Sequence, residues 1–386
     1  MSAPKVMTVY GTRPEAIKVA PVIKALEADP RFESIAVTTG QHRQMLDQVN
    51  TQFGITPAFD LDIMRPGQTL NGIVARAIAG LDEVIEKVQP DVIISQGDTS
   101  TAMAAAIAGF NRGVKIVHLE AGLRTGNILS PFPEEANRRI IGQVASLHLA
   151  PTNESKRNLQ REDFRSADIV VAGNSVIDAL LEATTWNTTF TDERLQQAAE
   201  SDARIVLFTT HRRENLDAMS NIGKAMARLA TEYPEIVFVL PAHLNPKVRA
   251  AVFPEIEGCE NILVTDPLPY NEFTKLMARA HIVLTDSGGV QEEAPALGKP
   301  VLVMRENTER PEAVTAGTVR LIGTDEDRIV SEAMTLLDTP AVYEAMANAV
   351  NPYGDGKAAA RTVAAIAELL GFGERLPDFN PVEMQS

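Results

Sequence analysis

Short apolar runs rich in valine and isoleucine alternate with longer stretches of helix-forming residues along almost the whole chain. In the first part of the chain these runs occupy residues 6–10, 34–39, 91–95, 114–119, 147–150 and 169–172. A second series follows at residues 204–209, 236–240, 261–264, 281–285, 300–304 and 318–322. Such runs are typical of buried parallel strands, and their alternation with helices is typical of βα units. The pattern therefore predicts an α/β protein with two doubly wound parallel sheets that face each other.

The two series predict two domains, as does a length of 386 residues, which exceeds what one hydrophobic core usually supports. The segment Gly173-Asn174-Ser175 and the polar stretch 186–202 mark the junction. We expect one domain over residues 1–172 and a second over residues 173–355. An alanine-rich helix follows the last strand, and no further strand comes after it. We therefore expect residues 356–386 to pack back on the first domain.

The turn after the apolar run 282–285 predicts an anion site. Ser287-Gly288-Gly289 opens a segment of helix formers, so backbone N–H groups are left uncovered at a helix N-terminus. Glycines have no Cβ, which lets a phosphate approach the backbone closely. Glu293 follows about one helical turn later and could accept hydrogen bonds from sugar hydroxyls. Taken alone, these residues fit an ordinary strand-to-helix turn equally well.

Ionisable residues stand at other predicted strand ends, where ligands bind in open α/β sheets. They are Arg13, Asp98, Glu120 and His211, and Glu134 joins them at a predicted helix start. Singly, Arg13 fits a surface salt bridge, Asp98 a helix N-cap, and His211 a solvated loop histidine. Together they predict one site in a cleft between the domains. His118 and His148 lie inside apolar runs, so we interpret them as core or supporting residues.

Composition excludes several other classes of protein. The one cysteine, Cys259, allows no internal disulfide and favours a reducing compartment. No apolar run approaches the roughly 18–20 residues of a membrane helix, and a net charge of −15 argues against non-specific nucleic-acid binding. No Gly-x-Gly-x-x-Gly follows the first strand, and the chain has neither a Walker A sequence nor Cys/His metal spacing. We therefore expect a cytoplasmic protein without a dinucleotide cofactor or a metal.

Several longer motifs carry a family resemblance. They are Gly11-Thr12-Arg13-Pro14-Glu15-Ala16-Ile17-Lys18, Gly97-Asp98-Thr99, His118-Leu119-Glu120-Ala121-Gly122-Leu123-Arg124, Pro131-Phe132-Pro133-Glu134-Glu135-Ala136-Asn137-Arg138, His211-Arg212-Arg213-Glu214, His243-Leu244-Asn245-Pro246, residues 285–295, Thr308-Glu309-Arg310-Pro311-Glu312-Ala313 and Asn351-Pro352-Tyr353-Gly354-Asp355-Gly356. In these motifs, which span essentially the whole chain, it resembles the non-hydrolysing UDP-N-acetylglucosamine 2-epimerases. The resemblance implies two Rossmann-like domains in the GT-B architecture and a cytoplasmic homodimer. It also implies interconversion of UDP-N-acetylglucosamine (UDP-GlcNAc) and UDP-N-acetylmannosamine (UDP-ManNAc), which supplies ManNAc for cell-surface polysaccharides.

The resemblance also implies roles for individual residues. The nucleotide-sugar contacts would be Arg13, Lys18, Phe273, Ser287, Gly288, Gly289, Glu293 and Arg310. The catalytic set would be Asp98, Glu120, Glu134 and His211. A second, regulatory nucleotide-sugar site would involve Gln41, Gln44, Gln68, Arg212 and His243. Gly67 stands where some members with that second site have an arginine.

The chemistry expected of such a site follows from the substrate. The C2 hydrogen of UDP-GlcNAc is next to no carbonyl, so simple deprotonation would give an unstabilised carbanion. Without a nicotinamide site, we expect elimination of UDP to 2-acetamidoglucal, followed by its re-addition. The two faces of C2 need one ionised and one protonated carboxyl group, and the sequence leaves open which of Asp98, Glu120 and Glu134 takes which role.

Other functions fit parts of the same pattern. They are a GT-B glycosyltransferase, a hydrolysing epimerase, an epimerase of a UDP-2,3-diacetamido uronic acid sugar, and a regulator that only binds a nucleotide sugar. The hydrolysing epimerases usually carry a kinase domain that has no counterpart here. The candidate carboxylates argue against the purely binding protein.

Overall fold

The computed structural model describes residues 3–40, 43–308 and 310–381. For residues 43–45, 213 and 214 it describes only the backbone. The chain forms two compact units. Unit 1 comprises Met1–Ala179 and Tyr353–Asn380, and Leu180–Pro352 make up most of unit 2. None of the helices in the described ranges is long and apolar enough to span a membrane.

Unit 1 is built on a parallel sheet whose strands lie, within the described residues, in the order β3-β2-β1-β4-β5-β6-β7. Its strands are β1 (Lys5–Tyr10), β2 (Glu33–Thr38), β3 (Phe59–Asp60), β4 (Val92–Gln96), β5 (Lys115–Leu119), β6 (Leu147–Ala150) and β7 (Ile169–Val171). Its helices are α1 (Arg13–Ala28), α2 (Arg43–Phe53), α3 (Leu70–Val88), α4 (Ser100–Asn111), α5 (Glu134–Val144), α6 (Asn153–Arg161), the 3₁₀ turn η1 (Ser166–Asp168) and α16 (Ala358–Leu369). Helix α7 (Ser175–Thr184) spans the boundary between the units.

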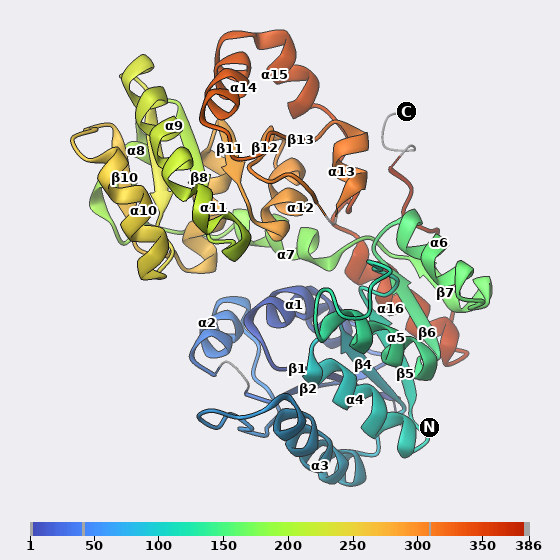
Figure 1. Cartoon of the computed structure of the whole chain (residues 1–386). Helices are drawn as coiled ribbons and strands as arrows, with labels where there is room; N and C mark the ends of the chain where they lie inside the picture. Colours follow the sequence, from blue (N-terminus) through green and yellow to red (C-terminus); the bar gives the residue numbers. More distant parts are fainter. Residues whose placement is uncertain (1–2, 41–42, 309, 382–386) are drawn as a thin grey trace. The chain divides into compact units, whose positions relative to one another are not determined.

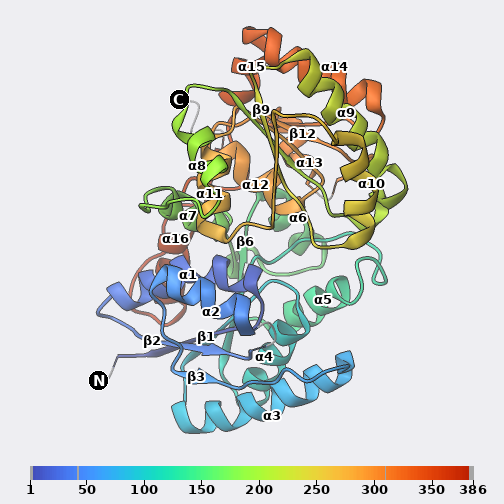
Figure 2. The same cartoon turned by 90° about the vertical axis from the view of Figure 1, so that its left-hand side faces the viewer.

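The helices of unit 1 cover both faces of its sheet (Figure 1, Figure 2). Helices α3, α4 and α5 pack side by side, with α4 in contact with both of its neighbours. On the other face α1 packs against α16, which returns to unit 1 from the end of the chain. Asp178 of α7 accepts hydrogen bonds from the backbone N–H groups of Ala358 and Ala359, at 3.2 and 2.9 Å, and so caps α16.

Unit 2 repeats this design with a second parallel sheet, in the order β10-β9-β8-β11-β12-β13. Its strands are β8 (Ile205–Thr209), β9 (Val237–Pro241), β10 (Ile262–Thr265), β11 (Ile282–Thr285), β12 (Val301–Val303) and β13 (Val319–Leu321). Its helices are α8 (Glu193–Glu200), the 3₁₀ turn η2 (Arg213–Ala218), α9 (Met219–Glu232), α10 (Pro246–Ile256), α11 (Tyr270–Arg279), α12 (Gly288–Ala296), α13 (Pro311–Ala316), α14 (Glu326–Asp338) and α15 (Pro340–Ala347). Helix α9 packs between α10 and α14 (Figure 1), over a core that contains Phe208, Met226 and Phe238.

The prediction of two doubly wound α/β domains is confirmed, and the strand order locates their ligand-binding edges. In each sheet the order reverses beside the first strand, between β1 and β4 in unit 1 and between β8 and β11 in unit 2. Ligands of such sheets bind beyond the carboxyl ends of the strands at this switch point. The turns that follow these four strands begin at Gly11, Gly97, Thr210 and Asp286. Each unit therefore places motif residues at its own switch point.

Candidate active-site residues

The backbone N–H groups at the start of α1, beside the switch point of unit 1, donate to the carboxylate of Glu15. Glu15 Oε2 accepts hydrogen bonds from the backbone N–H groups of Gly11 (2.8 Å) and Thr12 (2.7 Å). Its Oε1 accepts a hydrogen bond of 2.5 Å from Thr99 Oγ1, at the exit of β4. Burial raises the pKa of Glu15. In a dinucleotide-binding domain the N-terminus of this helix binds the pyrophosphate; here Glu15 occupies that place.

Glu120 follows β5 and lies in a tight polar cluster. Its Oε1 is 2.5 Å from Lys18 Nζ of α1 and accepts a hydrogen bond of 3.2 Å from Asn174 Nδ2. Its Oε2 accepts one of 2.6 Å from Gln96 Nε2. The Glu120 side chain is 9% exposed. Its backbone has a φ of +66°, a conformation that is strained for residues other than glycine. The structure thus pairs two residues that the sequence predicted separately, Lys18 and Glu120.

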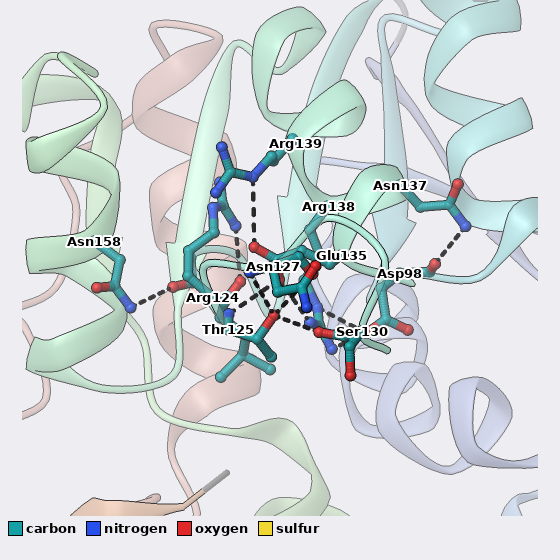
Figure 3. A network of polar contacts seen from close by, with 12 residues as sticks. Asp98, Arg124, Thr125, Asn127, Ser130, Glu135, Asn137, Arg138, Arg139 and Asn158 are labelled. Carbon is teal, nitrogen blue, oxygen red and sulfur yellow. Dashed lines mark hydrogen bonds and ion pairs between the residues drawn. The ribbon is translucent and has the colours of Figure 1, made fainter. Parts of the chain in front are cut away.

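Asp98 lies next to this cluster, at the exit of β4. A Cβ placed on the preceding residue, Gly97, would be 3.7 Å from Glu120 Oε2. The interpretation of Asp98 as a helix N-cap is wrong, because Thr99 caps α4 by accepting from Ala102 N. The Asp98 carboxylate instead faces α5, where Oδ2 accepts from Arg138 Nε at 2.9 Å (Figure 3).

His118 supports the same turn from inside the sheet. Burial lowers the pKa of His118 to about 3, so its ring is neutral near pH 7 and Nε2–H donates to the Gly97 carbonyl at 2.8 Å. Burial likewise lowers the pKa of His148 to about 4. Both side chains are 1% exposed, which confirms them as core or supporting residues. Glu134 is the first residue of α5 and is half-buried, and its side chain makes no hydrogen bond with any described residue.

The switch point of unit 2 is organised by Asp286, a residue that the sequence analysis did not single out. Its carboxylate is fully buried. It accepts hydrogen bonds from the backbone N–H groups of His211 (3.0 Å) and Arg212 (2.9 Å), from Thr210 Oγ1 (2.9 Å) and from Asn215 Nδ2 (3.3 Å). Asp286 follows β11, whereas its donors follow β8. One carboxylate therefore fixes the turn that presents His211.

We expect Asp286→Asn to reduce the free energy of unfolding by about 1–3 kcal/mol, since an amide leaves buried donors without an acceptor. The amide NH₂ would face some of the N–H groups that the carboxylate now accepts. Urea denaturation followed by circular dichroism measures the change. Asp266→Asn is a suitable control, because Asp266 accepts a hydrogen bond of 2.8 Å from Arg249 Nη2, but its side chain is 81% exposed. Equal stability of the Asp286→Asn and control variants would contradict the assigned role.

His211 itself is partly buried beside Asp286. Burial lowers the pKa of His211 below its usual 6.5, with smaller lowering from Arg212 and His243, while the Asp286 carboxylate opposes the shift. Its Nδ1 is 3.3 Å from Asp286 Oδ1, and its ring stacks on that of His243 with centroids 5.8 Å apart. A proton on Nδ1 is favoured by this carboxylate, which leaves Nε2 for other partners.

The start of α12, on the other side of this switch point, combines helix N–H groups with an arginine. Within the described residues the N-cap Ser287 makes no capping hydrogen bond through its side chain. A Cβ on Gly288 would lie 2.6 Å from Arg310 Nη1, so the guanidinium packs directly over this glycine. Arg310 Nε donates to Glu292 Oε1 at 2.5 Å, which holds it there. A cation and a helix N-terminus in one place favour an anion.

The other predicted site residues fall on both units. Arg13 begins α1, Phe273 lies half-buried on α11, and Glu293 lies buried on α12. The residues predicted for a second nucleotide-sugar site do not form one cluster within a unit. Gln68 accepts from the backbone of Arg65 in unit 1 at 3.2 Å, whereas Arg212 and His243 belong to unit 2. Gln41 and the side chain of Gln44 lie outside the described residues.

Comparisons with known proteins agree on one family. The family model described as UDP-N-acetylglucosamine 2-epimerase matches residues 24–367. The UDP-N-acetylglucosamine 2-epimerase of Salmonella typhimurium is 49% identical over 372 residues, which cover 94% of this chain and 98% of that protein. The Bacillus subtilis protein of the same name is 47% identical over 375 residues, covering 97% and 98%. Among solved structures, the UDP-GlcNAc 2-epimerase of Neisseria meningitidis bound to UDP-GlcNAc matches with a TM-score of 0.85 and 45% identity, covering 94% of this chain and all of that one.

Proposed function

The chain belongs to the UDP-N-acetylglucosamine 2-epimerase family and is an enzyme that acts on a nucleotide sugar, and we propose that it interconverts UDP-GlcNAc and UDP-ManNAc by elimination and re-addition of UDP. The observation that carries this mechanism is the division of chemistry between the units. Unit 2 provides a helix start with Arg310 above it, which suits a diphosphate. Unit 1 provides Asp98 and Glu120 at adjacent strand ends, which suit proton transfer at a sugar carbon.

In the first half of the reaction the C1–O bond breaks and UDP leaves with the electron pair. A carboxylate takes the C2 proton, and the electrons of the C–H bond form the C1=C2 double bond of 2-acetamidoglucal. Arg310 and the N–H groups at the start of α12 stabilise the charge that develops on the departing diphosphate. In the second half a phosphate oxygen of UDP adds back to C1, and C2 receives a proton on its other face.

The proton-transfer roles fall to Asp98, Glu120 and Glu134. Glu120 lies against Lys18, whose positive charge favours the ionised carboxylate. Asp98 is likewise paired with an arginine, whereas Glu134 has no side-chain hydrogen bond among the described residues. His211 is neutral near pH 7, since burial lowers its pKa, and it acts as a hydrogen-bond partner of the diphosphate.

The test is NMR of UDP-GlcNAc incubated with the purified protein alone in D₂O. We expect UDP-ManNAc to appear, with deuterium at C2, because the removed proton exchanges with solvent on the enzyme. Stoichiometric release of UDP would instead indicate a hydrolase. Release of UDP only after an acceptor is added would indicate a glycosyltransferase. Turnover only with a 2,3-diacetamido uronic acid nucleotide would identify the related epimerase. Product that stays fully protonated at C2 would contradict elimination.

We also propose an oligomeric state, a location and a pathway for the enzyme. The family resemblance supports a cytoplasmic homodimer that supplies ManNAc units for cell-surface polysaccharides. Light scattering of the purified protein tests the dimer, and a monomer mass at working concentration would contradict it.

A further inference from the structure

Helix α5 holds Asp98 at two points (Figure 3). The backbone carbonyl of Asp98 accepts from Asn137 Nδ2 at 2.8 Å. The carboxylate accepts from Arg138 through a single oxygen, Oδ2, with Nε at 2.9 Å and Nη2 at 2.6 Å. Two contacts on one oxygen fix the direction of the carboxylate. Oδ1, by contrast, makes no hydrogen bond with the described residues.

Arg138 also forms an ion pair with Glu135 of the same helix (Figure 3). The Glu135 side chain is fully buried, and that of Arg138 is 12% exposed. Glu135 Oε2 accepts from Arg138 Nη1 at 3.1 Å and from the backbone N–H of Thr125 at 3.1 Å. Its Oε1 accepts from Arg139 Nε at 3.4 Å. The buried carboxylate thus ties Arg138 to the loop that precedes α5.

We infer that Arg138, held by Glu135, is a positioning residue that aims Oδ1 of Asp98 at the C2 hydrogen of the substrate. This inference rests on the proposed function, in which Asp98 is one of the proton-transfer groups. Misplacing a catalytic group by 1 Å can lower the rate about 10²-fold. An ion pair that fixes the carboxylate of Asp98 can therefore contribute substantially to the rate. Because α5 also begins with Glu134, the same helix sets the places of two candidate carboxyl groups.

The geometry requires an arginine at this position. One planar guanidinium places Nε and Nη2 on Asp98 and Nη1 on Glu135 at the same time. A lysine ammonium is a single point charge on a flexible stem and cannot reproduce this planar fork. Arg138→Lys should therefore keep the charge but lose part of the orientation.

Arg139 provides a matched control, since it also pairs with Glu135 but makes no contact with Asp98. We expect Arg138→Met to lower kcat about tenfold to a hundredfold, with KM and the affinity for UDP changed less than threefold. Arg138→Lys should retain an intermediate kcat, and it replaces the methionine variant if that variant does not fold. Arg139→Met should keep a kcat within about twofold of wild type. An equal loss in both methionine variants would overturn the inference.

A double-mutant cycle with Asp98→Asn separates positioning from a general structural role. If Arg138 acts through Asp98, adding Arg138→Met to Asp98→Asn should lower kcat by less than about twofold further. Independent multiplication of the two losses would overturn the inference. Wild-type protein that does not turn over UDP-GlcNAc would contradict the proposed function itself. Wild-type turnover together with full activity of the Arg138→Met variant would contradict only the positioning role.

Discussion

Asp98→Asn and Glu120→Gln are each expected to lower turnover by about 10²–10⁴-fold, the usual contribution of a general acid or base. Both changes keep the size of the side chain and remove its charge. At residue 98 the amide NH₂ can turn toward the Arg138 guanidinium, which is a donor as well. At residue 120 the ion pair with Lys18 is lost. The affinity for UDP should change far less, because the proposed diphosphate contacts lie in unit 2.

Turnover of these variants is measured by NMR, and their affinity for UDP by calorimetric titration. Slow escape of 2-acetamidoglucal and UDP from either variant would support a stepwise reaction. Asp82→Asn is the control, since Asp82 also pairs with an arginine, Arg112, but its side chain on α3 is 47% exposed. An unchanged kcat in the Asp98→Asn and Glu120→Gln variants would remove these carboxyl groups from the mechanism.

The architecture could be predicted because buried parallel strands leave a strong local signal. Strands β4 and β11 each begin with three consecutive residues that are isoleucine, valine or leucine, and the sequence predicts the ends of both strands to within one residue. β3 was not predicted, because Phe59–Asp60 is two residues long and has no such run. A proline inside a helix usually kinks or ends it, but Pro21 does not end α1. The helix continues to Ala28, with Pro21 buried on its packed face.

The partners of the site residues could not be predicted, because they come from distant parts of the chain. Asp98 pairs with Arg138, 40 residues later, and Asp286 binds backbone groups 74 and 75 residues earlier. A local pattern contains no information about such pairs. The available signal for Asp286 was its position, an acidic residue directly after a buried strand and before a helix start. The motif directed attention instead to the glycines that follow it.

The role of those glycines also needed the structure. In the sequence, the small size of Gly288 and Gly289 is explained by the close approach of a phosphate. At Gly288 the space for a Cβ is taken by Arg310 Nη1, 2.6 Å away. At Gly289 the nearest described atom to such a Cβ, apart from the chain neighbours and the backbone of α12 itself, is Glu293 Oε2, at 3.8 Å, which is an ordinary contact. Among the described residues, therefore, no contact requires a glycine at residue 289.

Gly289→Ala is consequently expected to weaken UDP binding about 10²–10⁴-fold without harming the fold. Alanine favours the helix over glycine by about 0.8–1.0 kcal/mol, so the melting temperature should stay constant or rise. Loss of two hydrogen bonds to a charged phosphate, each worth about 1.5–3 kcal/mol, accounts for the expected loss of affinity. Calorimetric titration with UDP measures it.

Two further substitutions make this result interpretable. Gly288→Ala should also weaken UDP binding, but by displacing Arg310 rather than the ligand. Gly142→Ala is the control for helix propensity, since Gly142 lies inside α5 and a Cβ there would be 3.4 Å from the Phe164 ring. The control should bind UDP with wild-type affinity. If Gly289→Ala also bound UDP as the wild type does, the diphosphate could not lie against the start of α12, because the added methyl group would occupy the position proposed for a phosphate oxygen.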